Sequence, residues 1–234
     1  MALPKNVFTI YSLTIPSTKQ VVKFRQFNVG EQKALLLAQQ SENTTVMIDT
    51  LKGVLKSCIM DPIDVSALAT FDIDYMMLQI RAKSVGEIAE LNFACTACHE
   101  IVSISFDLTK LEVTFDPANT KQIDLGNNMG IILKYPQFDV LKKMDKFDVS
   151  DSTAIFNVVA DCIDFIWEGE QIFHAAEHTR DELNKFIDGL SESQFAAIKT
   201  FFDTLPKLEQ KVVFDCPKCK KHHDSVLKGI DSFF

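Results

Sequence analysis

Glycine is scarce in this chain, and this limits the enzyme sites that it can form. The 234 residues include 8 glycines, and they contain no phosphate-binding loop, no dinucleotide-binding fingerprint and no G-x-S-x-G nucleophile motif. Such sites need glycine where the backbone turns sharply or approaches a phosphate closely. The sequence therefore argues against a glycine-rich cradle for nucleotide phosphates.

Long apolar segments are absent as well. No stretch of about 18 uninterrupted apolar residues occurs, so no transmembrane helix is expected. The first residues, M-A-L-P-K-N, contain no charged segment followed by an apolar run, so no signal peptide is expected. The expected compartment is a reducing cytosol, where paired cysteines bind metal more often than they form disulfides.

The chain has no excess of positive charge. It contains 24 Lys and Arg against 32 Asp and Glu, which gives a net charge of -8 and disfavours general binding to a nucleic-acid backbone. Tryptophan and tyrosine are rare, with 1 and 3 residues, whereas there are 19 phenylalanines. We expect most phenylalanines to fill a core; the alternative is an exposed partner surface rich in phenylalanine.

The most distinctive feature of the sequence is a motif that occurs in two segments. Residues 91–104 and 212–227 each combine alternating apolar residues, typical of strands, with a C-x-x-C turn that follows a phenylalanine. The motif residues are Phe93, Cys95 and Cys98 in the first segment and Phe214, Cys216 and Cys219 in the second. Because four thiolates suit tetrahedral Zn²⁺, we predict a structural zinc site formed by Cys95, Cys98, Cys216 and Cys219.

Two other roles for these cysteines stay open, namely free thiols and a thioredoxin-like redox pair. The redox motif is expected at the start of a helix, whereas strands are predicted on both sides of each turn. Four cysteine ligands would leave no open coordination position, so hydrolysis at the zinc is not expected. The other two cysteines, Cys58 and Cys162, lie on apolar helical stripes and are predicted to be buried.

Basic residues cluster around the second turn, at Lys218, Lys220, Lys221, His222 and His223. One interpretation is a contact to an anion or a nucleic acid, as in some zinc ribbons. We favour the other, in which these cations offset the negative charge of four thiolates, because the chain is acidic and no aromatic residues interleave with the lysines.

Four histidines are candidate metal ligands, two beside the cysteine turns and two in an H-A-A-E-H segment. His99 and His222 are close to the cysteine turns, and we predict that they orient or screen the metal rather than bind it. His174 and His178 form H-A-A-E-H, which resembles half a metal site but differs from the metalloprotease H-E-x-x-H. We interpret these two as loop histidines.

Helix and strand signals occur along the whole chain. Alternation predicts hairpins within residues 7–27, 91–108 and 123–135, and short strands at 111–115 and 172–173. Apolar spacing predicts helices from Asn28 to Gln40, from near Thr45 to before Pro62, at 72–85, at 138–144 and from Ser152 to Ile166, and a packed tail at 230–234. Capping boxes predict two more helices, at Thr179 with Glu182 and at Ser191 with Gln194.

The predicted fold class is α+β, with helical lobes, short β-hairpins and a split four-cysteine zinc ribbon. We predict three parts. Residues 1–90 form an N-terminal hairpin plus helices, residues 91–108 and 210–234 form the split zinc ribbon with a C-terminal tail, and residues 109–209 form an inserted hairpin and helical region.

Several stretches resemble the T4-type bacteriophage baseplate proteins. Residues 79–87, Q-I-R-A-K-S-V-G-E, are similar to the L-R-x-K-S-x-G-E segment of that family, and residues 23–33 are similar to its K-F-R-Q-F-x-V-x-E-x-K stretch. The ending is similar as well, with F-F-D-T-L-P-K-L at 201–208, then the second cysteine turn and residues 227–234. These stretches span nearly the whole chain in order.

The resemblance implies a non-enzymatic component or assembly factor of the baseplate hub of a contractile-tailed phage, acting through protein–protein contacts. Its expected partners are hub or tape-measure proteins, with no membrane or nucleic acid. It would act in the host cytoplasm during assembly, and whether it stays in the virion tail baseplate is left open. The alternative is a zinc-ribbon protein that binds nucleic acid or acts in transcription.

Overall fold

The chain folds into two compact units. The computed structural model describes residues 7–41, 43–137, 140 and 152–229. Unit 1 consists of Met1–Val65, Phe71–Thr114 and Lys207–Phe234, and unit 2 of Ser66–Thr70 and Phe115–Pro206. The described strands pair antiparallel and alternate with helices, so the predicted α+β class is confirmed.

Unit 1 begins with the predicted hairpin and helices. Its elements are β1 (Ile10–Thr14), β2 (Val21–Arg25), α1 (Val29–Gln40), α2 (Thr44–Cys58) and α3 (Thr70–Val85). The 3-10 turn η1 (Val65–Ala67), between α2 and α3 in the chain, runs from Val65 of unit 1 into the short segment Ser66–Thr70 of unit 2. Asn28 starts α1 as predicted, because its side chain accepts from the N–H of Glu31 and the Glu31 carboxylate accepts from the N–H of Asn28. The Glu31 carboxylate also pairs with Arg25 at 2.7 Å, which ties the hairpin to this helix.

Helix α3 forms the centre of unit 1. Ile73, Met76, Met77 and Ile80, whose apolar spacing predicts this helix, are all buried. The opposite side of the helix is buried too, which includes the carboxylate of Asp72. This carboxylate accepts hydrogen bonds from the N–H of Ser17, at 2.8 Å, and from its hydroxyl, at 2.5 Å. A buried charge needs such partners, and here they fix the β1–β2 turn against α3.

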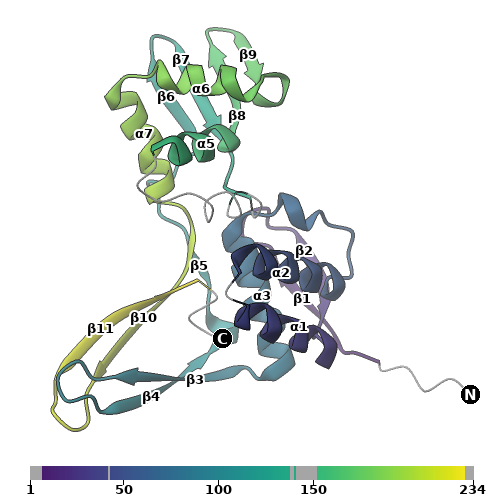
Figure 1. Cartoon of the computed structure of the whole chain (residues 1–234), viewed down its shortest axis with the longest axis vertical. Helices are drawn as coiled ribbons and strands as arrows, with labels where there is room; N and C mark the ends of the chain where they lie inside the picture. Colours follow the sequence, from purple (N-terminus) through teal and green to yellow (C-terminus); the bar gives the residue numbers. More distant parts are fainter. Residues whose placement is uncertain (1–6, 42, 138–139, 141–151, 230–234) are drawn as a thin grey trace, which may run out of the picture. The chain divides into compact units, whose positions relative to one another are not determined.

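Two antiparallel ribbons of unit 1 carry the cysteine turns. The first is formed by β3 (Ile88–Ala94) and β4 (Ile101–Asp107), and the second by β10 (Lys207–Asp215) and β11 (His222–Lys228). After the 3-10 turn η2 (Leu108–Lys110), the short strand β5 (Val113–Thr114) pairs with the start of β10. Figure 1 shows the ribbons side by side, and their inward residues share one core cluster with Leu78 and Ala82 of α3.

Unit 2 is a four-stranded antiparallel meander covered by helices (Figure 1). Its strands are β6 (Gln122–Gly126), β7 (Met129–Leu133), β8 (Ile163–Glu168) and β9 (Gln171–His174), with the 3-10 turn η3 (Ala175–Glu177) after β9. Its helices are α5 (Ser152–Cys162), α6 (Arg180–Asp188) and α7 (Glu192–Asp203). Both predicted capping boxes are present, at the starts of α6 and α7. Strands and helices share one apolar core.

The prediction of one helix from Ser152 to Ile166 is wrong in its second part. Helix α5 ends at Cys162, and Ile163 begins the strand β8. Ile132 of β7 pairs with Phe165, whereas Leu133 pairs with Ile163, so Asp164 is an extra residue in a β-bulge. The bulge puts Ile163 and Ile166 on the buried face three residues apart, a spacing that imitates a helix.

Two further predictions, the short helix at 138–144 and the packed tail at 230–234, lie outside the described residues except at Val140. Among the helices that the structure describes, none combines the length and the apolar character needed to cross a membrane.

Candidate metal centre

The two cysteine turns have the same backbone conformation. In the first, the N–H of Cys95 donates to the carbonyl of Glu100 at 2.8 Å, and the N–H of His99 donates back to the carbonyl of Cys95 at 2.9 Å. The second turn repeats both bonds, from Cys216 to Lys221 at 2.9 Å and from Lys220 to Cys216 at 3.0 Å. The fourth residue after each first cysteine has a positive φ, 57° at His99 and 61° at Lys220.

This conformation turns backbone donors toward sulfur. The N–H of Ala97 donates to Sγ of Cys95 at 3.4 Å. Because each turn curls around its first cysteine, Cys95 and Cys216 are fully buried, whereas Cys98 is half-buried and Cys219 is exposed. Hydrogen bonds within each turn therefore position its two thiols.

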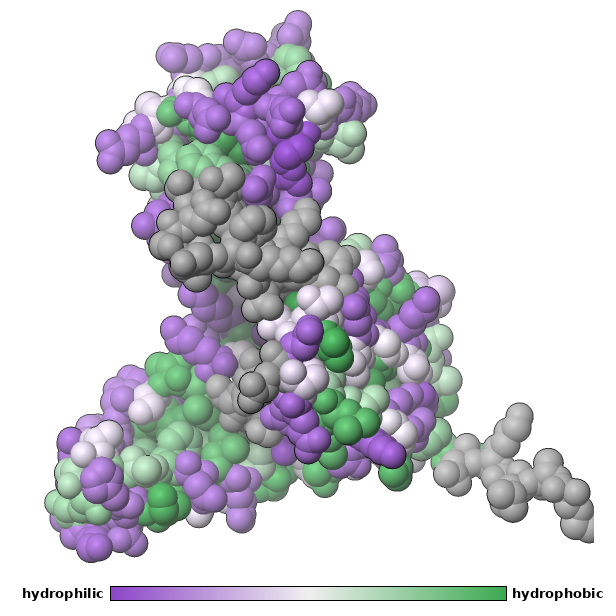
Figure 2. Space-filling model, in the orientation of Figure 1, coloured by the Kyte–Doolittle hydropathy of each residue, from purple (hydrophilic) through white to green (hydrophobic). Residues whose placement is uncertain are grey.

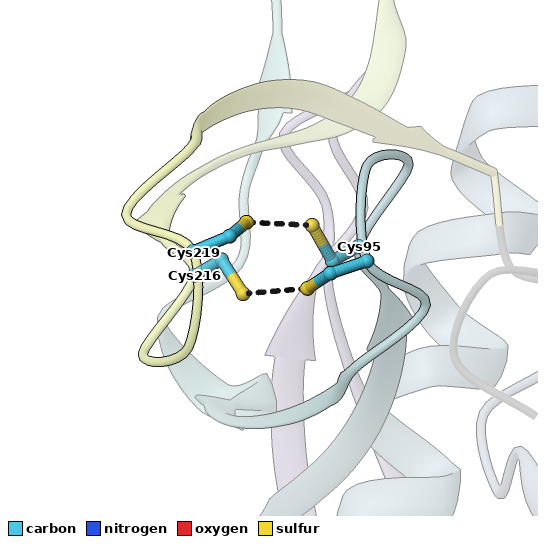
Figure 3. A group of neighbouring side chains, drawn as sticks. Cys95, Cys216 and Cys219 are labelled. Atoms are coloured by element: carbon cyan, nitrogen blue, oxygen red, sulfur yellow. Dashed lines mark hydrogen bonds between the residues drawn. The ribbon is translucent and has the colours of Figure 1, made fainter.

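The four sulfur atoms lie together. The two turns face each other (Figure 3). Sγ of Cys95 lies 3.6 Å from Sγ of Cys219, and Sγ of Cys98 lies 3.6 Å from Sγ of Cys216. All four lie within 4.8 Å of one another. Zinc–sulfur bonds of about 2.3 Å in a regular tetrahedron give sulfur–sulfur edges of about 3.8 Å, whereas a disulfide would need about 2.05 Å. The observed separation fits ligands around one ion.

The pKa values of Cys95 and Cys98 diverge, because backbone N–H groups stabilise the thiolate of Cys95 whereas desolvation and neighbouring sulfur atoms disfavour the thiolate of Cys98. Hydrogen bonds from the N–H groups of Ala97 and Cys98, together with His223, lower the pKa of Cys95 to about 5. The N–H of Glu100 lowers the pKa of Cys98, but loss of hydration and the neighbouring sulfur atoms outweigh it and raise this pKa to about 12. Four thiolates cannot all be ionised at this distance without a cation, and a divalent metal would supply it.

Phenylalanines hold the two ribbons together beneath the turns. The rings of Phe93 and Phe214, each two residues before the first cysteine of its turn, lie 5.7 Å apart. Phe93 also contacts Phe106 edge-on, with centroids 6.3 Å apart. These pairs bury aromatic surface directly beside the thiols, so the ribbons stay in register at the site. The repeated phenylalanine of the motif thus has a structural role.

His223 was named from the sequence only as one of the basic residues around the second turn, and its contact with a thiol was not predicted. His223 places Nε2 3.3 Å from Sγ of Cys95, and its ring stacks on Phe214 at a centroid distance of 4.7 Å. His222, which we predicted in this role, instead places Nδ1 2.8 Å from a carboxylate oxygen of Asp215. The pairing of Phe214 with His223 across the ribbon sets this difference, and an alternation count from Phe214 through the turn could have identified it.

The lysines of the second turn bridge to the first. Lys218 lies 3.2 Å from the carboxylate of Glu100, and Nζ of Lys221 donates to Oγ1 of Thr96 at 2.8 Å. The hydrogen bond to Glu100 and the charge of this carboxylate raise the pKa of Lys218, and negative charge on Cys98 and Cys216 adds to the effect. These contacts fit the interpretation in which cations offset thiolate charge, and they occupy two of the three lysines that a nucleic-acid site would need.

The histidines of H-A-A-E-H form no comparable centre. His174 ends β9, and His178 lies after η3, with Nδ1 3.8 Å from Glu182. Within residues 7–41, 43–137, 140 and 152–229, the four cysteines are the only group of three or more His, Cys, Asp or Glu side chains that could share one ion. Cys58 and Cys162 are buried, as predicted.

Comparison with known proteins identifies the family. The sequence profile described as T4 bacteriophage base plate protein matches residues 8–234. The chain belongs to this family. This baseplate protein is also 22% identical over 225 residues to the baseplate hub assembly protein gp26 of Enterobacteria phage T4, with 96% of this chain and 97% of gp26 covered. No solved structure matches the chain significantly.

Family membership assigns this baseplate protein a structural or assembly role in the phage baseplate, and the predicted resemblance is confirmed. Neither comparison supports the alternative role in nucleic-acid binding or transcription. What the structure adds is a group of four cysteines that lie close enough together to bind a metal.

Proposed function

We propose that this protein is a component or assembly factor of the baseplate hub of a contractile-tailed phage, that it acts through protein–protein contacts, and that it catalyses no reaction. The observation that carries the proposal is the similarity to the T4 hub assembly protein, which extends over 96% of this chain and 97% of that protein. Partners would be hub or tape-measure proteins of the same phage. They would be met in the host cytoplasm during assembly.

The test is a co-expression pull-down with the hub and tape-measure proteins of the phage that encodes this chain. We expect a stable or transient complex with at least one of them, and a reduced yield of assembled hubs when this protein is left out. Normal hub assembly without the protein, together with no complex after chemical cross-linking, would remove the proposal.

We also propose that Cys95, Cys98, Cys216 and Cys219 hold one structural Zn²⁺ and that the two ribbons with this ion form a split zinc ribbon. The support is chemical: the donor set is four thiols, and the sulfur separations of 3.6 Å lie close to the edge of a zinc–thiolate tetrahedron. When bound, the ion would neutralise thiolate charge and link the ribbons. With four protein ligands it would have no free position for a substrate.

Metal analysis with a matched pair of variants tests the zinc site. Protein purified without chelators is expected to contain about one zinc per chain. Cys216→Ala is expected to lose the zinc and to increase hydrogen exchange in both ribbons, whereas Cys58→Ala, which also removes one buried thiol, is expected to retain it. A wild-type protein without zinc, or a Cys216→Ala variant with full zinc content, would contradict the proposal.

The division into residues 1–90, 91–108 with 210–234, and 109–209 stays a prediction about folding units. Limited proteolysis tests it, because three separate folding units would require the first cleavages near residues 109 and 209, although these lie in η2 and in the paired strand β10. First cleavage elsewhere would contradict the division.

A further inference from the structure

Unit 2 carries the whole net charge of the protein. Of the 32 acidic and 24 basic residues, 16 acidic and 8 basic ones belong to unit 2, which therefore has a net charge of -8. Unit 1 contains the other 16 acidic and 16 basic residues and is neutral. Most of the unit 2 surface visible in Figure 2 is hydrophilic. A field of one sign attracts an oppositely charged partner and accelerates its approach.

An apolar pocket opens on this acidic unit. It has a volume of about 260 Å³ and lies between the sheet and α6. Ile166 of β8 and Leu183 of α6 are its buried residues, and Met129, Phe173 and Phe186 are half-buried around it. Pockets that take small molecules usually measure about 300–1,000 Å³, so this one is sized for a single large side chain.

Carboxylates stand at the edge of the pocket. Glu168, at the end of β8, and Glu182, in the first turn of α6, line it and are exposed, and His178 lies beside Glu182. The Glu182 carboxylate accepts hydrogen bonds from the N–H of Thr179 at 2.7 Å and from its hydroxyl at 2.8 Å. These bonds lower the pKa of Glu182 and fix its position. The pocket therefore has an apolar base and a fixed negative charge at its edge.

We propose that this pocket binds a basic segment of a baseplate partner protein, which inserts one large apolar side chain while flanking Lys or Arg residues pair with Glu168 and Glu182. The proposal rests on the proposed function, because it names the partner chemistry for contacts of that kind. An apolar anchor in a closely fitting pocket is the usual centre of such contacts, and charges at its edge select and steer the partner. A second copy of this chain is disfavoured as occupant because two acidic units repel each other.

The first experiment uses the full-length protein and a capped pentapeptide with a central phenylalanine between two pairs of lysines. We expect methyl NMR shifts at Met129, Ile166 and Leu183 when the peptide is added. A variant with Glu168→Gln and Glu182→Gln keeps the α6 capping box, which accepts Gln. We expect it to bind the peptide about fivefold more weakly or worse, since two exposed ion pairs are lost.

The matched control carries Asp188→Asn and Glu192→Gln, which remove the same charge from unit 2 away from the pocket. We expect its affinity for the peptide to stay within about twofold of wild type. Peptides with a central alanine or with glutamates in place of the lysines should not bind. The proposal is wrong if the alanine peptide binds equally well, if the shifts lie outside the pocket, or if both double variants weaken binding equally. It is also wrong if indole binds the pocket while the peptide does not.

The hub pull-down separates this proposal from the proposed function. If wild type captures a hub or tape-measure protein and the Glu168→Gln, Glu182→Gln variant captures it equally well, the pocket is not the docking site but the proposed function stands. If wild type captures nothing, the proposed function fails whatever the peptide does.

Discussion

The packing of Trp167 on Gly130 leads to a sharp prediction for the stability of unit 2. Gly130 is buried in β7, directly opposite Trp167 in β8. A Cβ at this position would overlap the six-membered part of the Trp167 ring and lie 2.5 Å from the carbonyl oxygen of Ile123. Real Cβ atoms do not approach backbone this closely, so the ring and the β6–β7 pair would both have to shift. Overpacking of this kind costs about 1–3 kcal/mol.

We expect Gly130→Ala to lower the free energy of unfolding by about 2–3 kcal/mol, at the upper end of that range because both a ring and a carbonyl are in the way. The assay is urea unfolding followed by tryptophan fluorescence, which reports on unit 2 because Trp167 is the only tryptophan. Its emission should also change in the folded state, since the ring must leave its place over the glycine.

The matched control is Gly53→Ala. Gly53 is exposed in the middle of α2, and a Cβ there would meet nothing within 4 Å. Because alanine is the better helix former, we expect this variant to gain about 0.5–1 kcal/mol, measured by circular dichroism. The same chemical change should thus have opposite signs at the two positions.

A double variant separates the ring from the backbone. Trp167→Phe lacks the two ring atoms nearest to the added Cβ, so Gly130→Ala should cost less in that background when unfolding is followed by circular dichroism. The reasoning would be refuted if Gly130→Ala unfolded within about 0.5 kcal/mol of wild type with unchanged emission.

Three further predictions concern single side chains. Burial raises the pKa of the Cys58 thiol to about 12, so it should resist iodoacetamide at pH 8 in the folded protein and react in urea, as mass spectrometry would show. The hydrogen bond from Arg25 lowers the pKa of Glu31 below its usual 4.5, so this carboxylate stabilises the fold above that pH and ceases to do so as the pH falls through its lowered pKa. The advantage of wild type over Glu31→Gln should therefore be present at pH 7 and vanish in acid unfolding titrations; a constant difference at all pH values would contradict it. Thr179→Ala should lower the free energy of unfolding in urea by about 1 kcal/mol because the side-chain cap of α6 is lost. Thr179→Ser keeps the capping hydroxyl and should retain most of this stability.

Local patterns were sufficient for much of the fold. The β1–β2 hairpin, α1 to α3, both ribbons and the starts of α6 and α7 follow from alternation, apolar spacing and capping residues, all of which act within a few positions of the chain. The same holds for each cysteine turn, because its backbone hydrogen bonds join residues of the same six-residue segment. The grouping of the four cysteines could be inferred because two matching turns on strands have few other chemical uses.

Other features depend on residues far apart in sequence, and the sequence analysis missed or misassigned them. Strand β8 has helical spacing, and only its pairing with β7 and β9, through a bulge, makes it a strand. His223 rather than His222 reaches Cys95 because the register of β10 and β11 decides which side chains face the thiols.

The pocket of unit 2 is assembled from β7, β8, β9 and α6 and has no linear signature. The sequence by itself determined the family, most of the elements and the four cysteines as candidate metal ligands, because these follow from residue identity and short spacing. The tertiary structure decided which side chains meet, because register and packing are set by contacts between segments that are distant along the chain.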